Sequence, residues 1–425
     1  QRRRTDRRHR VQRGLVVATP TPTVEIGFIG PAFDNAFTLD DAVKGKLDST
    51  DYVLSGTEVM ADLTDRCVSF VTRRGRSDWT MPFPPGKAKL LFRNTDGALD
   101  PLNTSSAYYP GITTGRTVTI KCNGHLIYSG LVEDINLGYD TSGDAWVTVI
   151  AEDQSSELGL RSLTSGTSFS EQTSGPRVSA VLANANIDYA GATSINAGYS
   201  TVAAETLSSD INAVQYLQKV TNSEQGYLYV SRSGVMTFEN RFGPLAAGSS
   251  LTFSDDGSDV PYQQIGRNLV SAELFNRLTA NRTGAATVTA NETDSQDSYG
   301  IRLLPVGEVL VLDDATVTDV LDFLMVQTAS TEVRINSLIA VLDTQASGTQ
   351  NTIAQLELAD AVTVEFTPPG VSQQSTVGTL QQIGHAYTVG ETWRVTLGMT
   401  PRDTTSYLIL DDATLGRLDY NSLGF

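Results

Sequence analysis

The sequence predicts a mainly β fold with an α+β insert, in which one chain carries two related β-barrel domains and a small α/β domain. From Val24 onward, short runs rich in Val, Ile, Thr and Tyr alternate with clusters of Gly, Asn, Asp and Ser, as in strands joined by tight turns. Helical periodicity is confined to a few segments. One order of strands and turns also occurs twice, once near residue 120 and again near residue 365.

The composition indicates a folded protein. The chain has 425 residues, of which 40% are hydrophobic and 19% are charged, so it can build real cores and is not disordered throughout. No apolar run reaches the roughly 18 residues that a bilayer span requires, and we expect no stable membrane insertion. Cys67 and Cys122 cannot make a disulfide framework, and they lack the spacing of metal ligands. Packing alone must therefore hold the fold.

The net charge of −17 is unevenly distributed along the chain. Residues 1–13 form a strongly basic arm, so the remainder is more acidic than the total indicates. An acidic surface repels free nucleic acid. The arm is interpreted as a solvated tail, because charge blocks usually are; the alternative is a segment that docks on an acidic neighbour.

Strands are expected wherever β-branched and aromatic residues run between turn residues. The clearest are 88–92, 116–121, 125–128, 145–150, 227–230, 235–239, 361–366 and 393–397. Three helices are expected. The first follows Asp210, which can cap it, and ends before Gly226. A second is expected at 316–328, where the apolar residues share one face, and a shorter third at 177–184.

The internal repeat is a strand, a reversal, a strand that begins at glycine, a turn, and a strand that opens with tryptophan. Residues 118–121 resemble residues 362–365. The other matched positions are Gly130/Gly378, Ile135/Ile383, Tyr139/Tyr387 and, after a one-residue slip, Gly143/Gly390, Asp144/Glu391 and Trp146/Trp393. We therefore expect Trp146 and Trp393, with Tyr139 and Tyr387, to be equivalent anchors of two related barrels.

A second internal similarity joins the ends of the chain. Residues 37–48 align without gaps to residues 408–419 and share a Leu-Asp-Asp motif. The motif residues are Leu39, Asp40 and Asp41 in the first copy and Leu410, Asp411 and Asp412 in the second. Each copy is interpreted as a docking hairpin with an Asp-Asp turn. Calcium binding is a weaker alternative, because the spacing fits no known calcium loop.

The residues that carry enzyme chemistry form no known pattern. The three histidines lie outside any HExxH motif, and no glycine-rich phosphate loop or nucleophile elbow is present. We therefore expect no catalytic residue, no cofactor and no bound metal. Assembly or binding is the expected class of function.

Several motifs resemble those of minor tail proteins of long-tailed, siphovirus-type actinobacteriophages. They are DLTDRCV at 62–68, RGR at 74–76, DPLNTSSAYYP at 100–110, GLVED at 130–134, SYGIR at 298–302 and the LDD…LGF ending at 410–425. The most specific of them contains Asp100, Pro101, Leu102, Asn103, Tyr108 and Tyr109. The basic arm lies outside the resemblance.

The resemblance implies a structural baseplate hub at the tail tip of a virion, assembled in the host cytoplasm. Such a hub is a homotrimer with two tail-tube-like barrels per chain, which together form a pseudo-six-fold ring. The implied partners are the distal tail protein or tail tube ring, the tape measure protein, and tail fibre or tip proteins. Phage DNA would pass transiently through the lumen, for which we expect an acidic wall. The alternatives are a hexameric distal tail protein and a receptor-binding adhesin.

The expected domains follow from these patterns. They are a basic arm (1–23), a segment with the first LDD hairpin (24–60), a first barrel (61–162), an α/β domain (163–249), a second barrel-like domain with an inserted helix at 316–328 (250–402), and the second LDD hairpin (403–425). The residues of the 100–110 segment and of both LDD motifs are expected to make contacts between subunits.

Overall fold

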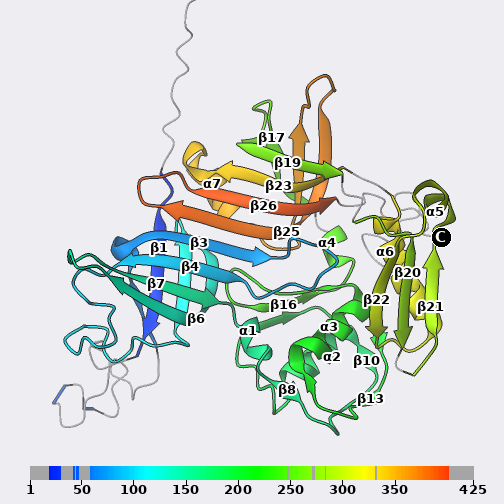
Figure 1. The fold of residues 1–425 in the computed structure, drawn as a ribbon, viewed down its shortest axis with the longest axis horizontal. Helices are drawn as coiled ribbons and strands as arrows, with labels where there is room; N and C mark the ends of the chain where they lie inside the picture. Colours follow the sequence, from blue (N-terminus) through cyan, green and yellow to red (C-terminus); the bar gives the residue numbers. More distant parts are fainter. Residues whose placement is uncertain are drawn as a thin grey trace, which may run out of the picture.

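The computed structural model describes residues 19–29, 42–43, 45–46, 58–246, 248–269, 273–282, 284–330 and 333–401. The described part is mainly β, and most of its strands belong to one large curled sheet (Figure 1). The basic arm and both LDD motifs lie outside the described residues, so their expected roles stay predictions.

The first five-stranded unit is antiparallel throughout, in the order β3-β4-β7-β6-β5. Its strands are β3 (Cys67–Gly75), β4 (Lys87–Arg93), β5 (Thr117–Cys122), β6 (His125–Tyr139) and β7 (Ala145–Glu152). β1 (Pro22–Phe28) extends the sheet beside β5, and β2 (Val59–Asp62) pairs with β1. A short 3-10 helix, η1 (Thr64–Arg66), leads into β3.

The second five-stranded unit has the same strand order, β19-β23-β26-β25-β24. Its strands are β19 (Gln264–Leu269), β23 (Val333–Val341), β24 (Ala361–Phe366), β25 (Gln374–Thr388) and β26 (Arg394–Pro401). β17 (Ser249–Ser254) lies parallel to β24, and β18 (Val260–Pro261) lies beside β17. The 3-10 helix η3 (Leu342–Thr344) and α7 (Ser347–Ala354) connect β23 to β24.

The repeated meander expected from the sequence is present as β5-β6-β7 and β24-β25-β26. Val118 pairs with Gly130 in the first copy, and Val362 pairs with Gly378 in the second. Each long central strand also carries a bulge at the same place, between residues 132 and 134 in β6 and between residues 380 and 382 in β25. The two meanders therefore share their strand order, this pairing and the bulge in the central strand.

An α/β unit follows the first five-stranded unit and has its own buried core. Its helices are α1 (Ser155–Leu158), α2 (Ser174–Leu182), α3 (Ala213–Glu224) and α4 (Gly243–Ala246). β15 (Tyr227–Val230) and β16 (Met236–Glu239) form the expected hairpin, with β11 (Thr193–Ile195) parallel to β16. Three two-stranded ladders complete the unit: β8 (Ser162–Leu163) with β14 (Ile211–Asn212), β9 (Ser168–Phe169) with β13 (Glu205–Thr206), and β10 (Gln172–Thr173) with β12 (Thr201–Val202).

Two helix predictions need correction at their starts. The first helix is capped by Asn212, whose side chain accepts a hydrogen bond from the backbone N–H of Val214, and not by Asp210. The helix expected at 177–184 is α2, which begins at Ser174 because Thr173 is the last extended residue. The helix at 316–328 is confirmed as α6 (Asp314–Thr328), capped by Asp313.

A further unit, absent from the sequence prediction, is inserted between β19 and β23. It contains β20 (Arg277–Arg282), β21 (Thr287–Asn291), β22 (Leu303–Val309) and α5 (Thr293–Tyr299), in addition to α6. Its three strands form a separate sheet, and α6 packs on β20 and β21 around a small core of its own. The inserted helix is therefore part of a folded unit.

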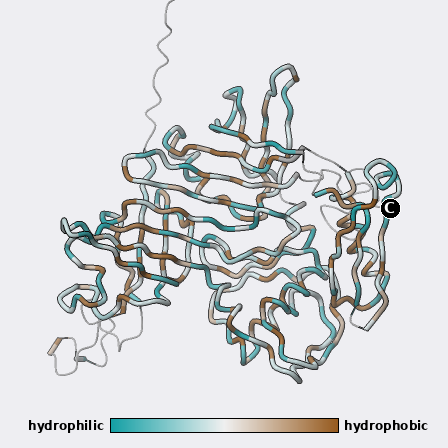
Figure 2. The backbone as a smooth tube through the Cα atoms, viewed as in Figure 1, coloured by the Kyte–Doolittle hydropathy of each residue, from teal (hydrophilic) through white to brown (hydrophobic). Residues whose placement is uncertain are grey.

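The two five-stranded units are joined into one sheet because β25 pairs with β3. The strands β19-β23-β26-β25-β3-β4-β7-β6 form an unbroken path, stacked in Figure 1 with β19 toward the top and β6 toward the bottom. Figure 2 shows hydrophobic residues concentrated along these strands and hydrophilic residues in the loops. Buried residues of both units belong to one continuous core.

Glu357 ties three units together beneath this sheet. Its carboxylate accepts a hydrogen bond from the guanidinium of Arg74 in β3, which is only 3% exposed. The other carboxylate oxygen accepts the backbone N–H of Arg232, on the β15–β16 turn, at 2.8 Å. Arg232 also donates to the carbonyl of Gln355 at 2.6 Å. One carboxylate therefore bonds to both five-stranded units and to the α/β unit.

We expect Glu357→Gln to lower the free energy of unfolding by about 3 kcal/mol, because it replaces the ion-pair partner of the buried Arg74 with a neutral amide. Urea unfolding followed by circular dichroism measures this change. Asp96→Asn is the matched control, since it removes the exposed Arg66–Asp96 pair, whose side chains are 30% and 53% exposed, and should cost less than about 1 kcal/mol. Equal losses in the two variants would contradict the role of Glu357.

Candidate functional site

The inner seam is the antiparallel pairing of residues 69–75 in β3 with residues 382–388 in β25. Backbone hydrogen bonds from Val389 N to Val68 O and from Arg76 N to Gln381 O bracket it at 2.9 and 2.8 Å. Gly75 is required at its end, because its φ of +90° suits glycine and an added Cβ would lie 2.1 Å from the carbonyl oxygen of Gln381. The pairing of β3 with β25 is therefore a specific contact between the two five-stranded units.

Aromatic side chains fill the core beneath the inner seam. The ring of Phe70 stacks on the ring of Tyr387, with their centroids 5.2 Å apart. It meets the ring of Trp393 edge-on, with centroids 5.3 Å apart. Trp393 is fully buried, and Tyr387 is half-buried. Phe70 comes from the first unit and the other two rings from the second, so each half supplies part of the joint.

His385 lies beside this cluster and is 3% exposed. Its ring faces Trp393 edge-on at 6.1 Å, and no described residue accepts or donates a hydrogen bond at its Nδ1. Burial, together with the nearby charge of Arg74, lowers the pKa of His385 to about 3. The imidazole is therefore neutral at physiological pH.

Trp146 and Trp393 do not occupy equivalent positions, in contrast to the expected alignment. Gly138 pairs with Trp146 in the first unit, whereas its counterpart in the second unit pairs with Arg394. Trp393 therefore corresponds to Ala145, and the expected one-residue slip is absent. Because neighbouring residues of a strand face opposite sides of the sheet, this shift buries Trp393 and leaves Trp146 42% exposed on the other face.

The segment at 100–110 is a self-bonded loop on the first unit. Asp100 and Asn103 accept hydrogen bonds from backbone N–H groups two residues ahead, at 2.8 and 3.1 Å. Tyr108 packs on Phe28 with ring centroids 4.7 Å apart. Pro101 is half-buried and Tyr109 is 38% exposed, while Leu102 is 88% exposed at the tip. The self-bonded loop presents Leu102 to solvent at its tip, and its role as a subunit contact stays a prediction.

The eight-stranded path has one face turned away from the core, and exposed charges on this face are mostly basic. They are Arg73, Lys87, Lys89, Arg93 and Arg394, against the acidic residues Asp134 and Glu152. Lys87 forms an ion pair with Glu152 at 2.6 Å. The expected acidic wall is therefore not found on this face.

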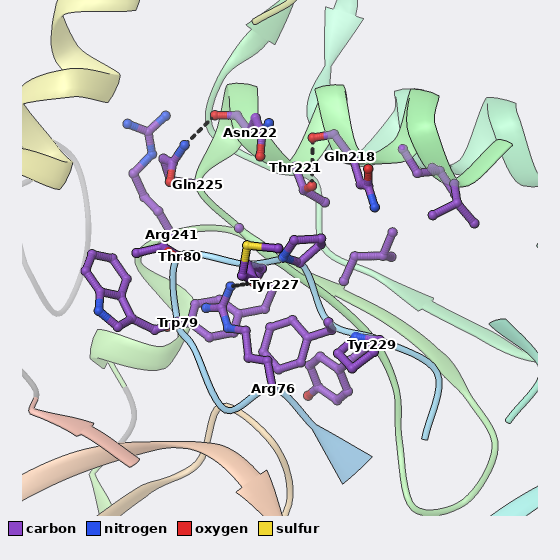
Figure 3. Close-up of a pocket in the computed structure, with 18 of the residues that line it drawn as sticks. Arg76, Trp79, Thr80, Gln218, Thr221, Asn222, Gln225, Tyr227, Tyr229 and Arg241 are labelled. Carbon is purple, nitrogen blue, oxygen red and sulfur yellow. Dashed lines mark hydrogen bonds between the residues drawn. The ribbon is translucent and has the colours of Figure 1, made fainter. Parts of the chain in front are cut away.

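A pocket of about 270 Å³ lies where the β3–β4 connection, α3, the β15–β16 hairpin and the inserted unit converge. Figure 3 shows Gln218, Thr221 and Asn222 along one wall and Tyr227 and Tyr229 along another. The guanidinium of Arg76 lies 4.3 Å from the ring centroid of Phe83 and 5.2 Å from that of Tyr227. The lining residues include no Asp, Glu, His, Cys or Lys, so the pocket offers stacking, amide hydrogen bonds and the cations of Arg76 and Arg241.

The structure brings together only some of the expected site residues. Trp393 and Tyr387 meet at the inner seam, whereas Tyr139 is 83% exposed at the end of β6. Leu39, Asp40, Asp41, Leu410, Asp411 and Asp412 lie outside the described residues. Sequence reasoning missed Phe70, Arg74 and Glu357. The RGR turn at 74–76 was noticed as a motif, but nothing near it in sequence indicated a partner 283 residues away.

Among the described residues, no group of three or more His, Cys, Asp or Glu side chains is placed to hold a metal ion. None of the described helices has the length and apolar character needed to span a bilayer.

The fold is similar to that of two solved tail proteins. One is a tail protein from Neisseria meningitidis, with a TM-score of 0.56 and 10% identity over 91% of this chain and 97% of that protein. The other is the 43 kDa tail protein of prophage MuSo2 from Shewanella oneidensis, with a TM-score of 0.54 and 10% identity over 89% of this chain and 98% of that protein. At this identity, the similarity concerns the fold. No protein-family model matches the sequence, and no curated protein matches it.

Both of these neighbours are tail proteins. A more specific family, among actinobacteriophages or elsewhere, does not follow from them.

We expect Trp393→Ala to lower the free energy of unfolding by about 3–5 kcal/mol, because it empties a fully buried site at the inner seam. Trp146→Ala removes the same side chain from an exposed face, and it should cost about 1 kcal/mol. Denaturant unfolding of both variants measures the difference. Similar losses of stability in the two variants would contradict the different positions of the two tryptophans.

We expect part of the stability to be lost in acid because of His385. The unfolded chain binds a proton at this residue near pH 6.5, whereas the folded chain does not bind it until about pH 3. Stability from this group is therefore complete above pH 6.5 and falls by about 1.4 kcal/mol per pH unit below it. Denaturant unfolding of the native protein and of His385→Gln at pH 7.5 and 5.0 checks this. The difference between their free energies of unfolding should be smaller at pH 5.0. A constant gap would contradict it.

Proposed function

We propose that this chain is a structural hub of a phage tail tip and not an enzyme, and that three copies assemble into one ring. The observation that carries the proposal is the duplication, since each chain holds two five-stranded units with the same strand order and register. Three such chains present six similar units in a ring, which can mate with a six-fold tail tube. The likeness of the fold to two tail proteins supports the same role.

The ring would join the tail tube or distal tail ring on one side to tip or fibre proteins on the other. Its lumen would admit the tape measure protein and then DNA. We place the face bearing Arg73, Lys89 and Arg394 toward this lumen, because the opposite face is covered by the core of the two units. On this proposal, the channel wall contributed by the sheet is basic, and its contacts with DNA depend on salt.

From the sequence resemblance, we further propose that the virion is a siphovirus-type phage of actinobacteria and that the hub, assembled in the host cytoplasm, lies at its tail tip. The main competing proposal is a distal tail protein, which would form a ring from six chains. A duplicated unit disfavours it, since six chains with one unit each already match a six-fold tube. A receptor-binding adhesin is the third candidate, and it requires binding of the isolated chain to a host surface.

The copy number of the chain decides among these proposals. We expect native mass spectrometry of the purified protein, and quantification of the chain in intact tails, to give three copies per ring. Six copies would establish the distal tail protein instead. A monomer that binds host cells or glycans, and is present in tails at neither stoichiometry, would favour the adhesin.

A further inference from the structure

The eight-stranded path has two edges that no described strand covers. β19 pairs with β23 on one side only. At the other end, β5 pairs with β6 only up to Leu131, so residues 134–139 of β6 have β7 as their one described neighbour. Unpaired strand edges leave backbone donors and acceptors ready for another strand. The sheet therefore has two open edges, β19 at one end and residues 134–139 of β6 at the other.

These two edges are the counterparts of the two strands that already pair at the inner seam. Residues 134–139 of β6 correspond to residues 382–387 of β25, because the matched pairs Val118/Gly130 and Val362/Gly378 and the matched bulges align the two strands. β19 occupies the place of β3, since each is the first strand of its unit and pairs with the second. β3 and β25 pair within one chain, and their counterparts, β19 and residues 134–139 of β6, are free to pair with another chain in the same way.

The residues of the β6 edge whose backbone N–H and C=O groups point outward are the ones that such a seam needs. The N–H of Asp140 donates to the carbonyl of Asp144 in the β6–β7 hairpin at 2.9 Å. Residues at alternate positions direct their backbone groups to opposite sides of a strand, so Ile135, Leu137 and Tyr139 direct theirs away from β7. At the inner seam, the counterparts of these residues are the ones that bond to β3. The β6 edge thus directs the same backbone groups outward as β25 directs toward β3 at the inner seam.

The side chains on the two edges also complement one another. Tyr139 is 83% exposed and Leu137 is 45% exposed, although the counterpart of Tyr139 is Tyr387, which stacks on Phe70. The counterpart of Phe70 in β19 is Ile265, which lies at the margin of the core. An apolar partner for Tyr139 is therefore present on β19.

Polar groups follow the same pattern. The Oδ1 of Asn268 in β19 is buried and has no hydrogen-bond partner among the described residues, and the register of the inner seam places it opposite Asn136. Charges are opposite as well. β19 carries Arg267 and no acidic residue, whereas the β6 edge carries Glu133, Asp134 and Asp140 and no basic residue.

We propose that β19 of one copy pairs antiparallel with the distal half of β6 in the next copy, in the register of the inner seam. Ile265 then lies opposite Tyr139, Gly266 opposite Gly138, and Asn268 opposite Asn136. This outer seam rests on the proposed ring and specifies how its subunits join. The contact is heterologous, because each copy uses a different edge toward each neighbour, and a ring is the arrangement that leaves no edge open.

Cysteine cross-linking of the full-length protein tests the register. Asn268→Cys with Asn136→Cys places two thiols on directly opposed residues of neighbouring copies, within reach of a disulfide. Asn268→Cys with Asp140→Cys is the matched control, since it uses the same face but lies four residues out of register. Cys67 and Cys122 are buried and leave the introduced thiols as the reactive ones. After mild oxidation, we expect a covalent trimer on a non-reducing gel for the first pair and none for the control.

Charge substitution on the exposed edge tests the seam without disulfides. Tyr139→Asp places a carboxylate opposite Ile265 and beside Asp140, and it should weaken trimer formation by about tenfold or more in sedimentation experiments. Leu160→Asp is the control, because Leu160 is 90% exposed on the α/β unit and should leave assembly unchanged. Circular dichroism confirms that both variants fold.

The outcomes separate this inference from the proposed function. A trimer that forms normally, but in which the matched cysteines stay unlinked and Tyr139→Asp has no effect, overturns the outer seam and leaves the hub standing. A cross-link within a single chain overturns it too, because the edges would then meet each other inside one copy. A native protein with six copies, or one, overturns the proposed hub itself.

Discussion

The pairing of β3 with β25 is the constraint on which the rest of the structure depends. It joins two five-stranded units into one sheet, and the aromatic rings of Phe70, Tyr387 and Trp393 fill the core beneath it. The buried Arg74 on β3 meets Glu357 of the second unit, and Glu357 in turn holds the α/β unit through Arg232. Without this seam, β3 and β25 would each expose an unpaired strand edge.

Local patterns in the sequence predicted the local structure well. The meanders and the helix at 316–328 could be found because β-branched runs, turn residues and apolar periodicity act over a few residues. The inserted unit was missed, since β20 and β21 are short and rich in Thr and Asn, and only the periodic helix beside them gave a clear signal. The cap at Asn212 was missed because a short strand, β14, delays the start of α3.

The candidate site was harder to predict, because its contacts join residues that are far apart in sequence. A lone Arg74 or Glu357 has no pattern that marks a partner in another unit. The tryptophan alignment differed from the structure by one residue, and in a strand one residue is enough to exchange a core position for an exposed one. Total charge was also a poor guide to local charge: the chain carries −17, yet the open face of its sheet bears more basic than acidic side chains.

The sharing of β25 between two partners also determines where this fold tolerates changes in length. The first half of β25 pairs with β24 and its second half with β3, while β26 follows most of it on the other side. One residue inserted into this strand would rotate every later side chain to the wrong face in both units at once. The connection between β19 and β23, in contrast, accommodates an entire folded unit. We therefore expect insertions and deletions to be tolerated in the connections, where new binding parts can be added without disturbing the sheet.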